Sequence, residues 1–200
     1  MANVDRPNGL HPMRYLSGAP YNGAANMYLF AAAEGTATFV GDLVKLAGSA
    51  GAAGDIVNGI DVEGIPTISQ GTAGTTSVGV VVGLLPDFSN LATVHRAAST
   101  LRVALVADDP NLVFEVQEVS GGTALTNVAV GLNADVVVGA GSTTTGSSGM
   151  ELDNSTEANT STLNCKIIGL VKRVDNNIGE HAKWMVTVNN HHYGVGVLGV

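Results

Sequence analysis

Two pairs of acidic side chains are the first candidates for chemistry in this sequence. Asp61 and Glu63 would share one face of an extended strand, and Asp108 and Asp109 are adjacent. Paired carboxylates can act as general acid and base in a hydrolase, or bind Ca²⁺, where a cleft tunes their pKa values. Aromatic residues, which could bind a saccharide substrate, make up only 4% of the chain. Turn capping and solubility are therefore the favoured roles of these acids.

Three histidines, His181, His191 and His192, are the candidates for a metal site. Such a site needs three or four ligands in a fixed geometry. Neighbouring residues on a strand point to opposite faces of the sheet, so His191 and His192 cannot bind one ion unless the strand ends there. We therefore expect no metal site.

The remaining motifs also favour structural roles. Cys165 is the only cysteine, which excludes an intrachain disulfide, and its strand-like surroundings favour a buried, unreactive thiol. Residues Gly194–Gly199 match GxGxxG, but a dinucleotide site needs a helix after these glycines, so we expect a glycine-rich tail. Ser142–Ser148 lacks a nucleophile-elbow pattern and is expected to be a flexible or partner-ordered loop. We predict no catalytic residue, no cofactor and no enzymatic activity.

Charge and hydropathy exclude two classes of partner. The formal net charge is −8, and the nine Lys and Arg residues are spread along the chain, which argues against binding nucleic acid. The first residues lack the apolar core of a signal peptide. The longest uncharged stretch, Gly64–Pro86, is interrupted by Pro66 and several glycines, so it is not expected to cross a membrane. We expect a protein made in a cytoplasm.

Short apolar runs rich in Val and Thr, separated by Gly-rich turns, predict β-strands along most of the chain. Asn26–Ala33 fits a short helix or a strand, and we favour a strand; Ser77–Leu85 is apolar on both faces. The turn Asp108–Asn111 is predicted to join Thr100–Ala107 and Leu112–Val119 into a hairpin. The other expected strands are Thr38–Leu46, Ile56–Val62, Ile65–Ser69, Ala134–Val138, Leu163–Val174 and Lys183–Asn189, the last of these with Trp184, Val186 and Val188 on its buried face.

The pattern predicts an all-β fold, an antiparallel β-sandwich or barrel. We divide the chain into an extended N-terminal arm (1–25), a small β-module (26–88) and a larger antiparallel β domain (89–200). Prolines and glycines exclude a long helix in the arm, yet apolar groups recur along it. The arm is therefore expected to pack on its own domain or on a neighbour, with a loose terminus as the alternative. The candidate partner-contact residues are Arg6, Leu10, His11, Met13, Arg14, Tyr15 and Tyr21.

Several of these strings resemble a known family. FVGDLVKLAGS (39–49) and GIPTISQGTAGTTSVGVVVG (64–83) look like the small β-module of the decoration, or cement, proteins that coat the heads of tailed bacteriophages. RAASTLRVALVADDPNLVFEVQE, GLNADVVVGAGSTTTGSSGMELD and IIGLVKRVDNNIGEHAKWMVTVNNH resemble the larger domain of cement-like virion proteins. The likeness extends from about residue 3 to residue 192.

The resemblance implies a structural virion protein that binds the outer surface of an icosahedral capsid, assembled in the bacterial host cytoplasm. Its implied partners are the major capsid protein and further copies of itself. The copies would form homotrimers at local threefold axes and stabilise the shell against the pressure of packaged DNA. Clamping of this kind needs a large interface and no reaction. Two alternatives stay open: another virion component, such as a tail or minor capsid protein, and a carbohydrate-binding or glycan-cleaving β-protein.

Overall fold

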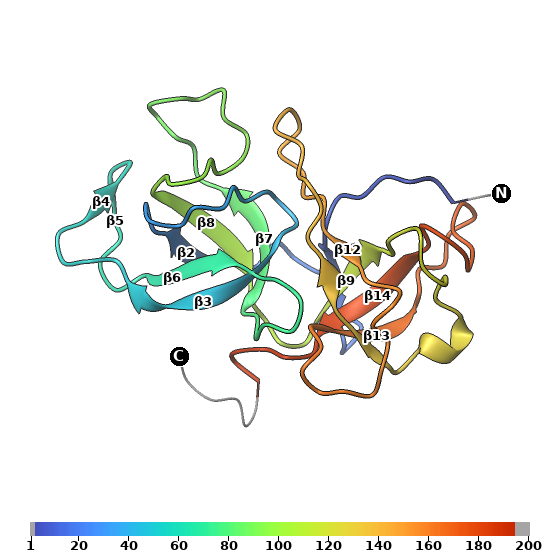
Figure 1. Ribbon diagram of the computed structural model, residues 1–200. Coiled ribbons are helices and arrows are strands. Elements are labelled where there is room, and N and C mark those ends of the chain that lie inside the picture. Colours follow the sequence, from blue (N-terminus) through green and yellow to red (C-terminus); the bar gives the residue numbers. More distant parts are fainter. Residues whose placement is uncertain (1–2, 195–200) are drawn as a thin grey trace.

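A closed barrel and a five-stranded sheet pack side by side in the computed structural model of this protein (Figure 1). The structure describes residues 3–194. Within this range the only helical element is a 3₁₀ turn, Asn127–Ala129, and there is no helix long and apolar enough to cross a membrane. The all-β prediction is thus confirmed, including a closed barrel.

The barrel closes through five strands in the order β2-β6-β3-β7-β8. Its only parallel pair is β2 with β6, and the other pairs are antiparallel. A short β-hairpin, β4 with β5, projects from the barrel between β3 and β6. The strands are β2 (Asn26–Phe30), β3 (Leu43–Ala50), β4 (Ile56–Val57), β5 (Ile60–Asp61), β6 (Pro66–Gln70), β7 (Gly79–Leu84) and β8 (Arg102–Ala107).

Alternation along β2 explains how the barrel is filled. Tyr28 and Phe30 point inward, where they pack with side chains such as Val81 and Val106. Leu29 points outward and is covered by Val57 of β4 and by Val62, the residue after β5. From Tyr28 to Phe30, β2 is therefore buried on both faces.

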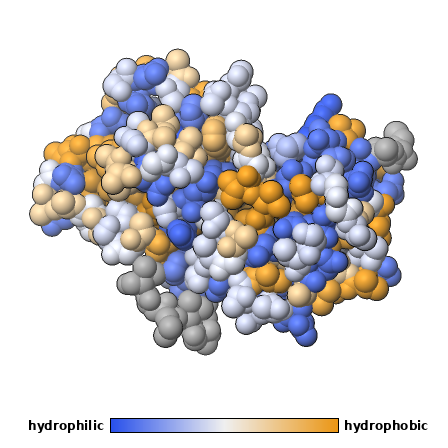
Figure 2. Space-filling view, viewed as in Figure 1, coloured by the Kyte–Doolittle hydropathy of each residue, from blue (hydrophilic) through white to orange (hydrophobic). Residues whose placement is uncertain are grey.

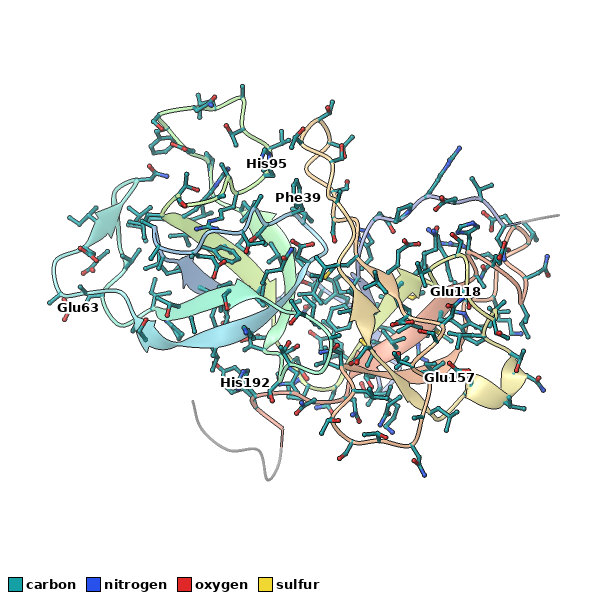
Figure 3. All side chains as sticks on the ribbon, in the orientation of Figure 1. Phe39, Glu63, His95, Glu118, Glu157 and His192 are labelled. Carbon is teal, nitrogen blue, oxygen red and sulfur yellow. The ribbon has the colours of Figure 1, made fainter. Side chains whose placement is uncertain are left out.

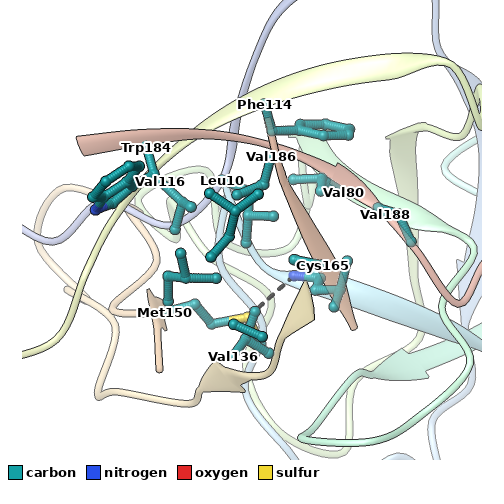
Figure 4. Packing of buried hydrophobic residues seen from close by; sticks show 14 of the residues in the cluster. Leu10, Val80, Phe114, Val116, Val136, Met150, Cys165, Trp184, Val186 and Val188 are labelled. Atoms are coloured by element: carbon teal, nitrogen blue, oxygen red, sulfur yellow. Dashed lines mark hydrogen bonds between the residues drawn. The ribbon is translucent and has the colours of Figure 1, made fainter. Parts of the chain in front are cut away.

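The second unit is an antiparallel sheet in the order β1-β9-β14-β13-β10, accompanied by the pair β11 with β12. The strands are β1 (His11–Tyr15), β9 (Leu112–Gln117), β10 (Asn133–Ala134), β11 (Val136–Val137), β12 (Glu151–Leu152), β13 (Cys165–Leu170) and β14 (Lys183–Val188). In β14 the predicted face of Trp184, Val186 and Val188 is buried, which confirms that alternation (Figure 4).

The core of the sheet extends onto the outer face of the barrel strands β3 and β7. Val44 and Val81 fill the barrel, whereas Leu43 and Val80, their neighbours on β3 and β7, face the core of the sheet. The Leu43 amide also lies 3.2 Å from the sulfur of Met150, shown as a dashed line in Figure 4. The barrel core and the sheet core thus lie on opposite faces of β7. This confirms the prediction that Ser77–Leu85 is apolar on both faces.

The predicted hairpin around Asp108–Asn111 is wrong. These residues do form a turn, but β8 before them pairs with β2 and β7 of the barrel, whereas β9 after them pairs with β1 and β14 of the sheet. The turn leads the chain from the barrel into the sheet. The domain division at residue 88 stays a prediction, although β8, which lies beyond it, pairs within the barrel.

The N-terminal segment lies across both units. Its strand β1 forms one edge of the sheet, and the Leu10 amide donates to the carbonyl of Gly41 at the entry to β3 (2.9 Å). Gly9 and Gly41 have φ values of +74° and +98°, and a Cβ on Gly9 would lie 2.4 Å from the Gly41 oxygen. Only glycine permits this crossing.

Candidate functional site

The predicted partner-contact residues are placed differently by the structure. Leu10 is 1% exposed and packs in the protein's own core, so its expected contact with a partner is not available in this fold. Arg6 is exposed, and the rest lie half-buried on β1 or just after it: His11, Met13, Arg14, Tyr15 and Tyr21. The outer edge of β1 is partly covered by the turn that follows, because the Tyr15 amide donates to Ala19.

A loop on the barrel, residues 86–101, carries large apolar side chains in water. We call it the apolar loop; it stands at the top of the barrel in Figure 1. Phe88 and Leu91 are 67% and 73% exposed, and Val94 and Leu101 are exposed as well. Apolar and hydrophilic residues are mixed over the face seen in Figure 2, and exposed apolar groups scattered singly are ordinary. A concentration on one element is instead typical of a binding surface.

Two buried arginines hold the apolar loop in place. The guanidinium of Arg96, fully buried, donates to the carbonyls of Ala31, Glu34, Thr36 and Thr100 and lies 5.1 Å from the centre of the Phe30 ring. The guanidinium of Arg102 likewise donates to the carbonyls of Leu85, Thr93 and His95. Planar guanidinium groups suit several fixed carbonyls at once. The two ends of the apolar loop are therefore fixed to the barrel.

A second loop, residues 139–149, is bonded to the barrel at its base. Val40 donates to Gly146 (2.9 Å), and Ser148 donates back to Val40 (2.8 Å). Gly141 lies against the Phe39 ring, which stacks on His95 with 5.0 Å between ring centroids (Figure 3). The expected loop at Ser142–Ser148 is thus anchored at its base, with an exposed tip at 142–145.

The acidic pairs separate into structural and exposed roles. The Asp61 Oδ1 accepts a hydrogen bond from the Glu63 amide (3.0 Å), and the Asp109 Oδ1 accepts one from the Asn111 amide (2.7 Å). Both are turn contacts, as predicted. Glu63 is exposed at the far end of the barrel (Figure 3). Asp108 instead accepts from the side chains of Tyr28 and Asn26.

The three histidines have different surroundings. His191 is buried, and its Nδ1 accepts from the Tyr193 amide (3.0 Å); burial lowers its pKa to about 4. His192 is half-buried, and burial lowers its pKa as well. His181 lies elsewhere, with Nδ1 at 3.5 Å from the Asp5 carboxylate. Gly194 is the last described residue, so the predicted glycine-rich tail lies outside the described residues.

His181 belongs to a cluster that sequence reasoning missed. Asp5, Glu151 and His181 each offer one atom suited to a cation, and these atoms lie within 4.8 Å of one another. The buried amide of Gln117 donates to Asp5 and Glu151, at 2.9 Å each. Burial raises the pKa of Glu151. The two carboxylates are thus bridged by a neutral donor.

Glu118 is a fully buried acid at the end of β9 (Figure 3). Its Oε2 accepts a hydrogen bond from Nε1 of Trp184 (2.7 Å), whereas no donor among the described residues reaches Oε1. Burial is the main cause that raises its pKa to about 7. Cys165 is also fully buried, and burial raises its pKa to about 12, in agreement with the predicted unreactive thiol.

Sequence signals for these features were weak. The three residues around Gln117 are joined only by tertiary contacts, so no local spacing marks them. Glu118 was the more visible feature, because an acid directly after the buried strand β9 must be paired or neutral. Comparison with protein-family models, with curated proteins and with solved structures finds no match to this chain.

Proposed function

We propose that this chain is a structural protein of a tailed-bacteriophage virion that binds the outer surface of the icosahedral capsid. In this proposal it assembles in the host cytoplasm and stabilises the shell against the pressure of packaged DNA. Its partners are the major capsid protein and further copies of itself, as homotrimers at local threefold axes. The proposal involves no reaction.

The observation that carries the proposal is the apolar loop. Phe88 and Leu91 expose most of their side chains on a loop whose later part, from Thr93 to Thr100, is held by Arg96 and Arg102. Binding costs less free energy when the contact surface is already ordered. Burial of such side chains against a coat subunit would contribute roughly 25 cal/mol for each Å² of apolar surface, from which the cost of association is subtracted.

The rest of the fold suits the same role. In this proposal the N-terminal residues 1–25 act as an arm whose surface groups, such as Arg6, Met13 and Arg14, contact a neighbour. The larger β domain, residues 89–200, is proposed to pack as a β-sandwich. The net charge of −8 would keep the protein from trapping DNA during packaging.

A binding experiment tests the proposal. Purified protein is mixed with DNA-filled capsids that lack it, and the bound fraction is measured after sedimentation. The double variant Phe88→Ser/Leu91→Ser should remain folded and lose most of its binding. The control Val174→Ser removes a side chain that is 93% exposed on the other unit, and should bind normally. Equal binding by all three proteins would contradict the role of the apolar loop.

One alternative within the virion remains: a tail or minor capsid protein would use the same loop on a different partner. It would bind few sites per particle, whereas a decoration protein saturates near the number of coat subunits or a simple fraction of it. The saturation level of the sedimentation experiment separates the two.

A further inference from the structure

A groove lies beside the connection between the barrel and the sheet. Its volume is about 630 Å³, and it is wide open to solvent. The walls come from β2, from Pro66 of β6, from the connecting residues 108–111 and from Tyr193. Among the residues that line it there is no lysine, arginine or histidine, but there are two carboxylates, those of Asp108 and Asp109.

The Asp108 carboxylate is fixed in one orientation. The Tyr28 hydroxyl donates to its Oδ2 (2.7 Å), and the amide nitrogen of Asn26 lies 3.0 Å from both oxygens. Tyr28 is buried, and burial raises the pKa of its phenol, so this donor keeps its proton. Neither Asp108 nor Asp109 takes part in an ion pair within residues 3–194. The nearby His191 interacts with both carboxylates, but burial lowers its pKa to about 4, so it is neutral at pH 7 and the two charges face neutral groups alone.

Tyr193 adds an aromatic surface to the same groove. Its hydroxyl lies 3.1 Å from that of Tyr28, and because Tyr28 donates to Asp108, Tyr193 must donate to Tyr28. The backbone amide of Tyr193 is held by His191. The Tyr193 residue nevertheless stays 48% exposed. An anchored aromatic ring thus stands beside two carboxylates with no cation.

We propose that this groove binds an arginine side chain of a partner protein. A guanidinium is planar, stacks on aromatic faces and donates several parallel hydrogen bonds to carboxylates. A saccharide would also suit a tyrosine and an amide, but two carboxylates without a counter-charge favour a cation. The identification of the partner as the coat protein rests on the proposed function; the chemistry of the groove does not.

The test uses the full chain and a short probe, the peptide acetyl-Gly-Arg-Gly-amide. Backbone amide signals are followed by NMR during titration. We expect those of residues 108–111 and Tyr193 to shift in a saturable way. The same peptide with citrulline, which has the shape of arginine without its charge, should leave them in place.

Two matched variants assign the effect. Asp109→Asn removes one charge while its side-chain oxygen still accepts the Asn111 amide, and it should weaken peptide binding about two- to fivefold, as for exposed charge pairs. Asp61→Asn makes the same change in an equivalent exposed turn of the barrel and should have no effect.

Three results would overturn the inference: no shift with the arginine peptide, equal shifts with the citrulline peptide, or a response in the groove to maltotriose alone. The inference and the proposed function can fail separately. Capsid binding without any peptide response would reject the groove and keep the function. A specific peptide response in a protein that does not bind capsids would reject the function and keep the groove.

Discussion

Glu118 provides a prediction in which the sign and the size of a pH effect both follow from the structure. Its side chain is fully buried, with one oxygen bonded to the Trp184 indole and the other without a donor among the described residues. Burial raises its pKa from 4.5 to about 7, and the charges of Glu180 and Glu157 add to the shift. The Trp184 indole and the backbone amide of Leu125 oppose this shift.

The direction follows from linkage. An acid whose pKa is higher in the folded state binds its proton more tightly there, so the stability falls as the pH rises from 4.5 towards about 7. Each pKa unit corresponds to about 1.4 kcal/mol, so the full loss is about 3 kcal/mol. Between about pH 5 and about pH 8 the expected loss is roughly 2–3 kcal/mol.

The variant Glu118→Gln isolates this effect. Its side-chain oxygen can still accept from Trp184, while its new amide N–H groups lack an acceptor and cost about 1–3 kcal/mol at every pH. Urea unfolding is followed by the fluorescence of Trp184, the only tryptophan, at both pH values. Other titrating groups, such as Glu151 and His191, cancel in the comparison. From about pH 5 to about pH 8, the free energy of unfolding of the wild type should fall by about 2–3 kcal/mol more than that of the variant. Equal pH dependence in the two proteins would refute the reasoning.

Three further predictions concern the core and the apolar loop. Trp184→Ala should destabilise the fold by about 3–5 kcal/mol in urea unfolding followed by circular dichroism; a loss below about 1 kcal/mol would be inconsistent with its complete burial. Arg96→Lys should cost at least about 2 kcal/mol, because one ammonium cannot replace the guanidinium on four carbonyls. The exposed control Arg6→Lys should change stability by less than about 0.5 kcal/mol, and equal losses would contradict the role of Arg96 in fixing the loop. Cys165 should not react with a thiol reagent at about pH 8 in the folded protein but should react fully in urea; rapid labelling of the folded protein would show that it is accessible.

The strands were predictable where burial follows a simple period. Trp184, Val186 and Val188 alternate with less apolar neighbours, and the structure buries all three. Ser77–Leu85 lacks such alternation because the barrel core and the sheet core lie on its two sides. In both segments the local pattern of apolar residues is enough to predict which faces of the strand are buried.

The pairing of strands was not predictable from local signals. Asp108–Asn111 has the composition of a turn, and it forms one, but turn chemistry does not say whether the chain returns to the same sheet. Here the strands on its two sides enter different units. The groove was not predictable for the same reason. Tyr28 contacts both Asp108 and Tyr193, and these residues are far apart in the sequence.

The measurement that tests the central claim most directly is the copy number of this chain in purified virions of the phage that encodes it. Quantitative mass spectrometry gives that number relative to the major coat protein. The account predicts abundance close to that of the coat protein, or a simple fraction of it set by the threefold axes. A few copies per particle would place the chain in the tail or at a vertex, and complete absence from virions would contradict the account.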